Sequence, residues 1–438
     1  MIQITDKQQC CGCASCVQKC PKQCISLYED NEGFLYPQVD KDVCIDCGLC
    51  EKVCPILTPY NTREPLQVLA AINKDEKIRM QSSSGGIFTL LAESIIKEGG
   101  VVFGARFDDE WQVTLDYTET MEGLAAFRGS KYVQARTGET YKQCEYFLKE
   151  DRKVLFTGTP CQIAGLHHYL RKEYENLITC DFVCHGVPSP KVWRLYLKEI
   201  IDDANKVITD IQFRNKDNGW KNFNFKFTYD DDRKITTLSS CYCDNIYMRA
   251  FLKDMILRPS CYECSTKEGK SKSDISIADF WGIQFHHPDM DDDKGTSLVL
   301  IHTNKGKNLI DISKIKCIES NYETALSTNR GLQPTVIPHK NRNKFFVELE
   351  STDNLCSLIL KFSKPTIKQR FRLLLNLFKR TVQNIICGGG VICKNQESTI
   401  NSSILLDYNS ICYITFRDKQ EGWYSYKMVI KIKQCFNE

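Results

Sequence analysis

The pattern of apolar and polar positions predicts a short hairpin near the N-terminus and an alternation of helix and strand after it. Apolar runs at residues 25–28 and 34–36 flank the polar sequence Asp-Asn-Glu-Gly, which is typical of a β-hairpin. Residues 87–97 carry apolar side chains near helical spacing, and a Gly-Gly pair then leads into a predicted strand at 101–103. Between these regions, the prolines and polar residues of 58–65 predict a linker.

A β-loop-α-β unit is predicted near the middle of the chain. It comprises a strand at 154–156, a helix at about 162–172 and a strand at 177–183. Such a unit places its strands in parallel with a right-handed crossover. Cys161 and Cys184 then each follow the carboxyl end of a parallel strand, the edge where open α/β sheets bind ligands. Two cysteines there are compatible with coincidence, a redox pair or half of a metal site.

The most informative feature of the amino-acid composition is the number of cysteines. The 438 residues suffice for two or three domains, and no apolar stretch reaches the length of a membrane-spanning helix. The first nine residues are polar, so no secretory signal is expected. A net charge of +3 argues neither for nor against nucleic acid, and no DNA-binding motif is apparent, so we expect no nucleic-acid partner. The 24 cysteines are spaced as metal ligands in a large chain, which predicts a reducing, cytoplasmic environment rather than disulfides.

Two cysteine runs in the first 55 residues share the spacing C-x2-C-x2-C-x3-C-P. Three closely spaced sulfurs hold one face of a cubane, and the fourth reaches the other cluster, as in bacterial two-cluster ferredoxins. Two zinc sites are the alternative, but zinc gives no reason to repeat the C-x3-C-P ending. Cys11 and Cys24 fall outside the pattern and are expected to be packing residues or neighbours of ligands. The runs predict one [4Fe–4S] cluster on Cys10, Cys13, Cys16 and Cys54, and a second on Cys44, Cys47, Cys50 and Cys20.

Two polar segments suggest a phosphorylated cofactor. Residues 82–86 open the helix at 87–97 with serines and glycines, and a serine N-cap with small neighbours leaves backbone N–H groups for an anion. Capping without a ligand is the alternative. The sequence 128–132, Arg-Gly-Ser-Lys-Tyr, adds two cations, a hydroxyl and an aromatic ring, which suits a ring-bearing phosphorylated cofactor. A solvated turn is the alternative for that segment.

A third cluster is suggested by a further C-x2-C pair, Cys261 and Cys264, which completes a set of four with Cys161 and Cys184. The spacing across this set is irregular, so Cys241 or Cys243 remains an alternative member. Among the histidines, only His185 is singled out as a proton donor, because it follows Cys184, and no catalytic residue is assigned.

At these residues the chain resembles the β-subunit family of coenzyme F-420 hydrogenases and dehydrogenases. The resemblance covers about residues 1–380. It implies a flavin, usually FAD, beside a [4Fe–4S] cluster, with a hydride carrier docking at the flavin. The segments that carry it, in order along the chain, are 83–86, 129–134, 157–162, 184–188, 213–216, 219–220, 259–264, 274–282, 294–297 and 303–306.

Applied to this sequence, the resemblance implies that one set of four cysteines binds the cluster beside the flavin. It also implies that two short segments contact the flavin. Asp279 and Trp281 could shape the flavin pocket or simply end a packed strand. Family membership does not fix the substrate. The implied ligands are Cys161, Cys184, Cys261 and Cys264, and the implied flavin contacts are Ser83, Ser84, Gly85, Gly86, Gly129, Ser130, Lys131 and Tyr132.

The expected fold class is α+β. A two-cluster ferredoxin-type domain (1–57) precedes an α/β flavin and iron–sulfur domain in two parts (66–145 and 146–345), and a basic helical tail (346–438) follows. From 354 to 396 the tail has eight basic and no acidic residues, which suits peripheral contact with an anionic membrane or an acidic partner, although a packed helix with a basic face is the alternative.

The expected function is electron transfer between the clusters and a flavin that exchanges hydride with a small organic substrate or a deazaflavin-like carrier. The expected partner is a redox protein or a small hydride donor or acceptor. The alternative is an electron-relay subunit without its own substrate, serving a partner enzyme, for instance in surface-polysaccharide synthesis. A cluster-based redox sensor would require an effector domain, and none is apparent.

Overall fold

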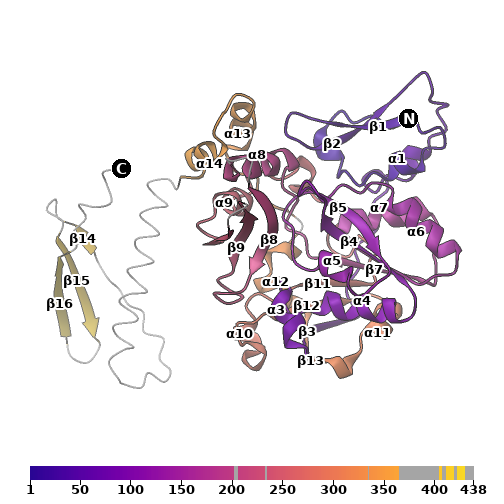
Figure 1. Ribbon diagram of the computed structural model, residues 1–438. Coiled ribbons are helices and arrows are strands. Elements are labelled where there is room, and N and C mark those ends of the chain that lie inside the picture. Colours follow the sequence, from indigo (N-terminus) through magenta and orange to yellow (C-terminus); the bar gives the residue numbers. More distant parts are fainter. Residues whose placement is uncertain are drawn as a thin grey trace. The chain divides into compact units, whose positions relative to one another are not determined.

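The computed structural model describes residues 1–201, 206–231, 234–333, 335–364, 404–406, 411–418 and 422–429. Residues Met1–Lys364 form one compact unit, and Pro365–Glu438 belong to a second. The ferredoxin-type region is therefore part of the larger unit. Figure 1 labels the elements of both units.

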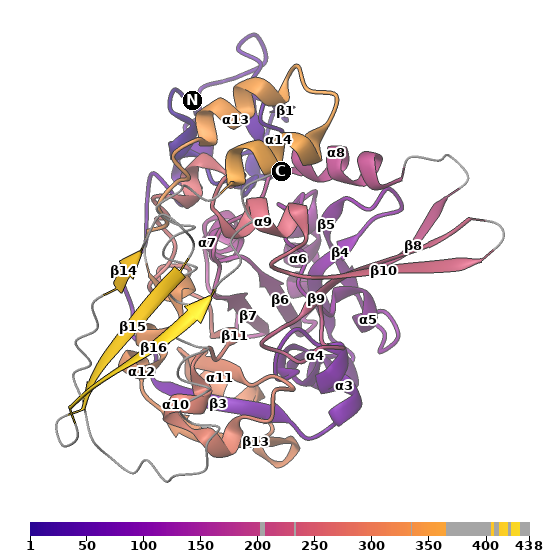
Figure 2. The same ribbon diagram turned by 90° about the vertical axis from the view of Figure 1, so that its left-hand side faces the viewer.

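A mixed eight-stranded sheet forms the centre of the larger unit (Figures 1 and 2). Its four central strands, β4, β6, β7 and β11, run parallel, and the remaining strands pair antiparallel at its two sides. The order across the sheet is β13 (Ile315–Ser320), β3 (Gln67–Asn73), β12 (Ser297–Ile301), β11 (Ile275–Asp279), β7 (Leu177–Phe182), β6 (Val154–Gly158), β4 (Val101–Phe107) and β5 (Val113–Thr118).

Both faces of the sheet are covered, as parallel strands require. Val102, Leu155 and Ile178 point to the face covered by α4 (Ile87–Lys97). Their sequence neighbours, including Phe103 and Phe156, point to the face covered by α6 (Thr140–Lys149) and α7 (Pro160–Leu170). Shorter helices complete these layers: α3 (Glu76–Gln81), α5 (Leu124–Phe127), α10 (Ile283–His286), α11 (Asn304–Leu309) and α12 (Tyr322–Thr328).

The predicted β-loop-α-β unit is confirmed by β6, α7 and β7, whose strands are parallel neighbours. The loop ends in a capping box, in which Thr159 accepts from the backbone of Gln162 and the Gln162 side chain accepts from Thr159 N–H. Cys161 is the second residue of α7, and Cys184 follows β7 by two residues. Both cysteines thus lie just beyond the carboxyl ends of parallel strands.

The N-terminal region contains the predicted hairpin, formed by β1 (Ile25–Glu29) and β2 (Leu35–Val39), together with α1 (Ser15–Lys19) and α2 (Leu49–Lys52). Asp30 closes the hairpin by accepting from the backbone N–H of Phe34. Helix α1 packs against α6 and α7, and Ser15 Oγ donates to the Gly165 carbonyl at 2.8 Å. A Cβ atom on Gly165 would lie 2.8 Å from Ser15 Oγ, so this glycine permits the close approach.

The segment predicted as a linker is fastened to the body of the unit. The carbonyl of Thr58 lies 2.7 Å from Nε2 of His168, and the ring of Tyr60 packs on that histidine. Further along, the Arg63 guanidinium donates to the Ser273 carbonyl. These contacts hold residues 58–65 in place between the ferredoxin-type region and β3.

A second layer consists of the antiparallel strands β8 (Val207–Asn215), β9 (Asn224–Asp230) and β10 (Ile235–Cys241). In Figure 2 one end of these strands extends away from the rest of the unit. Their inner ends share a core with α8 (Pro190–Ile200), α9 (Ile246–Leu252), α13 (Arg342–Leu349) and α14 (Leu355–Ser363). Trp193, Phe213 and Tyr247 pack at its centre.

The helical tail predicted for 346–438 is helical in only part of its described residues. The end of α13 and all of α14 fall in this range, and both helices belong to the larger unit. The described residues of the second unit form three antiparallel strands instead, β14 (Ile404–Leu406), β15 (Ile411–Asp418) and β16 (Gly422–Val429). β-Branched and aromatic residues dominate β15 and β16, and these residue types favour strands. Most of the basic stretch predicted to contact a membrane or an acidic partner lies outside the described residues. No helix in the described ranges has the length and apolar character needed to span a membrane.

Candidate iron–sulfur centres and cofactor site

Two cavities in the N-terminal region are lined by cysteines. They have similar sizes, with about 380 and 350 Å³ of space free of protein atoms. The fourth cysteine of each run lies at the cavity of the other run, in the arrangement that the two-cluster spacing predicts. The first cavity is lined by Cys10, Cys11, Cys13, Cys16 and Cys54, and the second by Cys20, Cys24, Cys44, Cys47 and Cys50.

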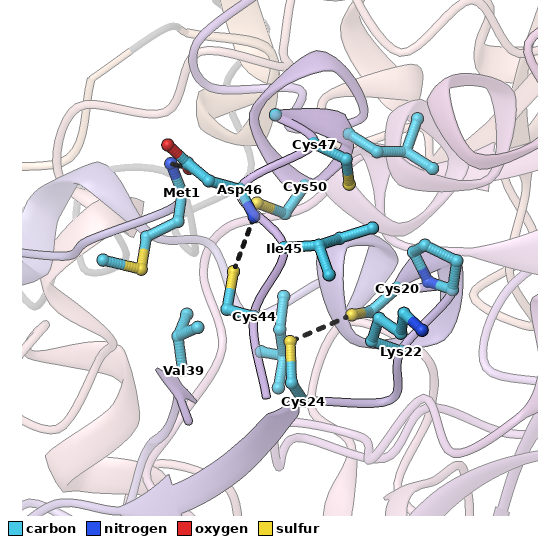
Figure 3. Close-up of a pocket in the computed structure, with 14 residues that line it drawn as sticks. Met1, Cys20, Lys22, Cys24, Val39, Cys44, Ile45, Asp46, Cys47 and Cys50 are labelled. Atoms are coloured by element: carbon cyan, nitrogen blue, oxygen red, sulfur yellow. Dashed lines mark hydrogen bonds and ion pairs between the residues drawn. The ribbon is translucent and has the colours of Figure 1, made fainter. Parts of the chain in front are cut away.

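Figure 3 shows the second cavity, where the sulfurs converge from α2 and the loops before it. Backbone N–H groups point at its sulfurs: Ile2 N lies 3.2 Å from Cys50 Sγ, and Asp46 N lies 3.4 Å from Cys44 Sγ. Cys24 lies outside the sequence motif, but its Sγ atom is 3.4 Å from Cys20 Sγ. Donors directed at sulfur are the usual surroundings of iron–sulfur clusters.

The pKa values of the cysteines at the first cavity fit sulfurs bound to iron better than they fit free thiols. Burial raises the pKa of Cys54 to about 11 and the pKa of Cys16 well above its ordinary value. Neighbouring cysteines add to both shifts. Four thiols crowded in this way do not ionise together unless cations bind their sulfurs, and iron provides such cations.

Three separate segments bring the third set of cysteines together at the sheet edge. Cys161 comes from the start of α7, Cys184 from the end of β7, and the other two from a 3₁₀ turn (Pro259–Cys261) and the loop after it. Burial raises the pKa of Cys184 well above its ordinary value, and Cys261, Cys161 and Cys264 contribute to this shift. The other three thiols are thus close enough to Cys184 to disfavour its ionisation. Cys241 and Cys243, the alternative members, contact each other instead.

Cys11 connects the first and third sets, a placement that sequence spacing did not reveal. Its thiol is buried, and the neighbouring thiols of both Cys13 and Cys161 raise its pKa well above the ordinary value. The Cys11 thiol in turn lowers the pKa of Cys13 to about 6, with help from Ser15, whose Oγ lies 3.4 Å from Cys13 Sγ. The only sequence signal was the doubled cysteine at the start of the first run.

A buried arginine lies between the same two sets. Arg258 is fully buried, and its guanidinium donates to the Cys10 carbonyl (2.7 Å), to Gln134 Oε1 (3.1 Å) and to Cys10 Sγ (3.5 Å). The charge of Cys261 also acts on it. Within the described ranges no carboxylate pairs with Arg258. Since a buried cation needs an anionic partner, this site fits a cluster whose four thiolate ligands give it a net negative charge.

A second buried cation adjoins the third set. Lys267 affects the pKa of Cys184, and its ammonium group donates to the Gln333 carbonyl at 3.0 Å. In the part of the chain that the structure describes, it too has no carboxylate partner. Both cations thus lie beside sulfur rather than beside an acidic side chain.

The two segments expected to contact a flavin lie against each other. Ser83 Oγ accepts from Ser130 N–H at 2.7 Å and contacts Ser130 Oγ at 2.9 Å. The expected serine N-cap is wrong. The N-cap of α4 is Gly86, whose φ of +83° favours glycine, and no side chain caps the helix. Ser84 instead donates to the Thr296 carbonyl. The first-turn N–H groups of α4 consequently have no capping side chain.

Lys131 is an unpaired cation beside these serines. Loss of hydration lowers the pKa of Lys131 to about 7, and Arg106 lowers it further. Its ammonium group donates to the carbonyls of Arg128 (3.3 Å) and Gly129 (3.2 Å) and lies over the ring of Phe107, 5.8 Å from the centroid. No carboxylate among the described residues pairs with it. Gly129 has φ +86°, and no atom lies within 4 Å of the position of an added Cβ. An anionic, phosphorylated cofactor fits this combination.

Arg214 links the two expected flavin segments. Its guanidinium forms a two-point ion pair with Asp279, at 2.8 and 3.0 Å, and also donates to Tyr132 Oη (3.2 Å) and the Ser83 carbonyl (3.3 Å). Trp281 stacks parallel on Trp220, with ring centroids 4.8 Å apart. Asp279 therefore anchors Arg214, a role that strand-end position alone did not indicate.

His185, the histidine singled out beside Cys184, is half-buried, and its Nε2 pairs with Asp254. Its ring packs edge-on against Phe251. His185 thus lies next to the third set in the sequence, but its Nε2 atom is already paired with the Asp254 carboxylate.

Comparison with known proteins identifies the family of this chain. Residues 68–140 match the family model "Coenzyme F420 hydrogenase/dehydrogenase, beta subunit N-term", and residues 151–324 match the model for its C terminus. Together they cover over half of the chain. Residues 9–56 match the "4Fe-4S dicluster domain" model.

Individual relatives agree with these matches over parts of their length. A subunit of the F(420)H(2) dehydrogenase of Methanosarcina mazei is 23% identical over 171 residues, which cover 37% of this chain and 49% of that protein. "Ferredoxin 7Fe" of Hydrogenibacillus schlegelii is 50% identical over 48 residues, which cover 11% of this chain and 55% of that protein. The chain therefore spans about half the length of these curated relatives.

A chain from the F420-reducing nickel–iron hydrogenase complex of Methanosarcina barkeri aligns over 72% of this chain and 93% of its own length, at 16% identity. Its TM-score of 0.39 is too low to compare the two folds in detail. The family matches, in contrast, agree in order with the motifs and cysteine sets described above. The chain therefore belongs to the coenzyme F-420 hydrogenase/dehydrogenase beta-subunit family and carries an N-terminal 4Fe–4S dicluster domain.

Proposed function

We propose that this chain is an iron–sulfur flavoprotein oxidoreductase. It passes electrons between [4Fe–4S] clusters and FAD, and exchanges hydride with a small organic substrate or a deazaflavin-like carrier. The observation that carries the proposal is the close packing of the first cysteine run on α7, the helix that carries Cys161: Ser15 Oγ donates to the Gly165 carbonyl at 2.8 Å, and the thiols of Cys13 and Cys161 both raise the pKa of Cys11. This packing joins the ferredoxin-type region to the cysteine set at the sheet edge. Adjacent centres allow electrons to move along one path.

The three cysteine sets hold the clusters in this proposal. Cys11 and Cys24 lie beside ligands without belonging to a set of four. Arg258 and Lys267 compensate the negative charge of the clusters in the protein interior. The sets are Cys10, Cys13, Cys16 and Cys54; Cys44, Cys47, Cys50 and Cys20; and Cys161, Cys184, Cys261 and Cys264.

The flavin contacts are the segments 83–86 and 129–132. Lys131 and the uncapped N–H groups of α4 would hold a phosphate, and Gly129 leaves room for close approach. Arg214 and Asp279 hold both segments in place through Ser83 and Tyr132. When bound, a flavin supplies exchange of a hydride on one side and of single electrons on the other.

A second candidate function is that of an electron-relay subunit. One relative is by name part of a dehydrogenase with several subunits, so a partner enzyme could complete the reaction. In that case the clusters and flavin would transfer electrons only when the partner is present.

Anaerobic reduction of the loaded chain separates the two functions. With reduced deazaflavin as the probe, the leading proposal expects flavin bleaching followed by the electron paramagnetic resonance (EPR) signals of reduced clusters. Reduced ferredoxin should produce the same two signals in the reverse order. Cluster reduction by ferredoxin together with no response to any hydride donor would favour the relay. Flavin bleaching without cluster signals would contradict both functions.

A further inference from the structure

A pair of thiols at the end of β10 lies outside the three cysteine sets. Cys241 is the last residue of β10, opposite Asn224 in β9, and Cys243 follows two residues later. Their Sγ atoms are 2.9 Å apart. Cys243 is exposed and Cys241 is half-buried, so reagents in solution can reach the pair.

The backbone on both sides of this pair is fixed. The N–H groups of Asp244 and Asn245 both donate to the Cys241 carbonyl, at 2.9 and 3.0 Å, and form a tight turn. The buried Asn245 side chain caps α9 at Met248 and donates to Tyr196 Oη at 2.8 Å. The two thiols consequently face each other in a defined geometry.

The pair also lies near the residues proposed to contact the flavin. The Tyr242 ring stacks on Phe223, with centroids 4.4 Å apart and an angle of 20°. The Arg214 guanidinium also lies over Phe223, 4.1 Å from the centroid of its ring. Two aromatic side chains therefore separate the turn that carries the thiols from Arg214.

We propose that Cys241 and Cys243 form a reversible dithiol–disulfide site that reacts with low-molecular-weight disulfides. The Cys241 thiolate attacks one sulfur of the external disulfide R–S–S–R, forms a mixed disulfide and releases one R–S⁻. Cys243 then loses its proton to solvent, and its sulfur attacks Cys241 and releases the second R–S⁻. In total, two protein thiols are oxidised to one disulfide, and one external disulfide is reduced to two R–SH.

The order of attack follows from the hydrogen bond between the thiols. Contact with Cys241 and loss of hydration raise the pKa of Cys243 to about 11. Cys243 thus keeps its proton longer and is less available than Cys241 to attack an external disulfide. Cys241 is therefore the cysteine that attacks the external disulfide, and Cys243 is the cysteine that breaks the mixed disulfide.

A soft divalent cation is the competing occupant. One carboxylate oxygen of Asp244 and both sulfurs lie within 4.8 Å of one another. Structural zinc sites, however, use four protein ligands, and only three gather here among the described residues. The number of donors therefore favours the disulfide.

Tryptic mapping of the cluster-loaded full chain tests the proposal, since cleavage after Lys234 and Arg249 yields a peptide with only these two cysteines. After equilibration in glutathione buffers of increasing oxidised fraction and alkylation, this peptide should lose two hydrogens and its alkylation sites. The peptide that contains buried Cys144 is the control and should stay reduced. Cys243→Ser should accumulate a mixed disulfide with glutathione at Cys241, whereas Cys241→Ser should do so several-fold more slowly.

Four results would overturn the proposal. The peptide could remain a dithiol at every glutathione ratio, or carry two glutathiones. Added Zn²⁺ could bind one per chain and protect both thiols, which would identify a metal site. Finally, either serine variant could lose iron, which would make the pair cluster ligands. Unchanged iron content in both variants separates this site from the proposed function of the clusters.

Discussion

The N-terminal cysteine sets and the third set reach a similar arrangement by different routes. Each N-terminal set takes three cysteines from one short run, and in the second set backbone N–H groups approach the sulfurs. The third set takes cysteines from α7, the end of β7 and a distant turn, and buried cations lie near it. Local spacing thus suffices to build the first kind of site, whereas the second kind requires the folded sheet.

The comparison also indicates how the two regions are coupled. Arg258 donates a hydrogen bond to Cys10 of the first set, and the charge of Cys261 of the third set raises the pKa of Arg258. One cysteine from each of the same two sets raises the pKa of the buried Cys11 thiol. The boundary between the regions therefore contains a buried cation and a buried thiol near cysteines of both sets.

The largest expected effect is loss of the third cluster alone. Cys184→Ser should remove about four irons per chain and leave the two N-terminal clusters, because their ligands come from other segments. Cys180→Ser is the matched control, since Cys180 is buried in β7, the strand that leads to Cys184, but belongs to no set. Iron analysis and EPR check this outcome. Equal iron loss in both variants would show general misfolding instead.

Contact between the two regions should be sensitive to a single methyl group. In Gly165→Ala the new Cβ would lie 2.8 Å from Ser15 Oγ and 2.9 Å from Cys13 Cβ, so α1 must shift away from α7. Such overpacking costs about 1–3 kcal/mol. Thermal unfolding should show the loss, with Ser15→Ala as a control that removes the hydrogen bond without adding an atom. An unchanged Tm in Gly165→Ala would contradict the close approach.

Arg258 should raise the potential of the first cluster. Positive charge and hydrogen bonds stabilise the reduced cluster, so Arg258→Met should lower its potential by on the order of 60 mV, the one-electron equivalent of about 1.4 kcal/mol. Arg342→Met is the control, because Arg342 is also buried against an aromatic ring but pairs with Glu32. EPR-monitored redox titration measures both. If Arg258→Met does not fold, Arg258→Lys provides a smaller shift in the same direction.

The smallest expected effect is a pH dependence of flavin binding. The pKa of Lys131 is about 7 without a bound anion, so above pH 7 this lysine must take up a proton to bind phosphate. Flavin affinity should therefore fall as pH rises above 7, by at most about tenfold per pH unit. Fluorescence titration of released flavin checks this slope. Lys131→Met should bind more weakly with a flatter profile, and an unchanged slope would exclude Lys131 as the phosphate contact.

Sequence patterns anticipated features that depend on neighbouring residues. The hairpin β1–β2, the β6–α7–β7 unit and the positions of Cys161 and Cys184 at the strand ends all followed from local periodicity. Features set by distant contacts did not. The pKa of Cys11 depends on Cys161, which is distant in the sequence. The hydrogen-bond partners of Arg258 also lie over 100 positions away along the chain. Serine at a helix start was likewise misleading, because Ser83 and Ser84 bond to Ser130 and Thr296 instead of capping α4.

Iron, acid-labile sulfide and released flavin, measured per chain after anaerobic purification, test the central claim most directly. Three clusters beside one flavin predict about twelve irons, a matching amount of sulfide and one flavin per chain. About eight irons without flavin would contradict the third cluster and the flavin site, and would leave a ferredoxin-like relay.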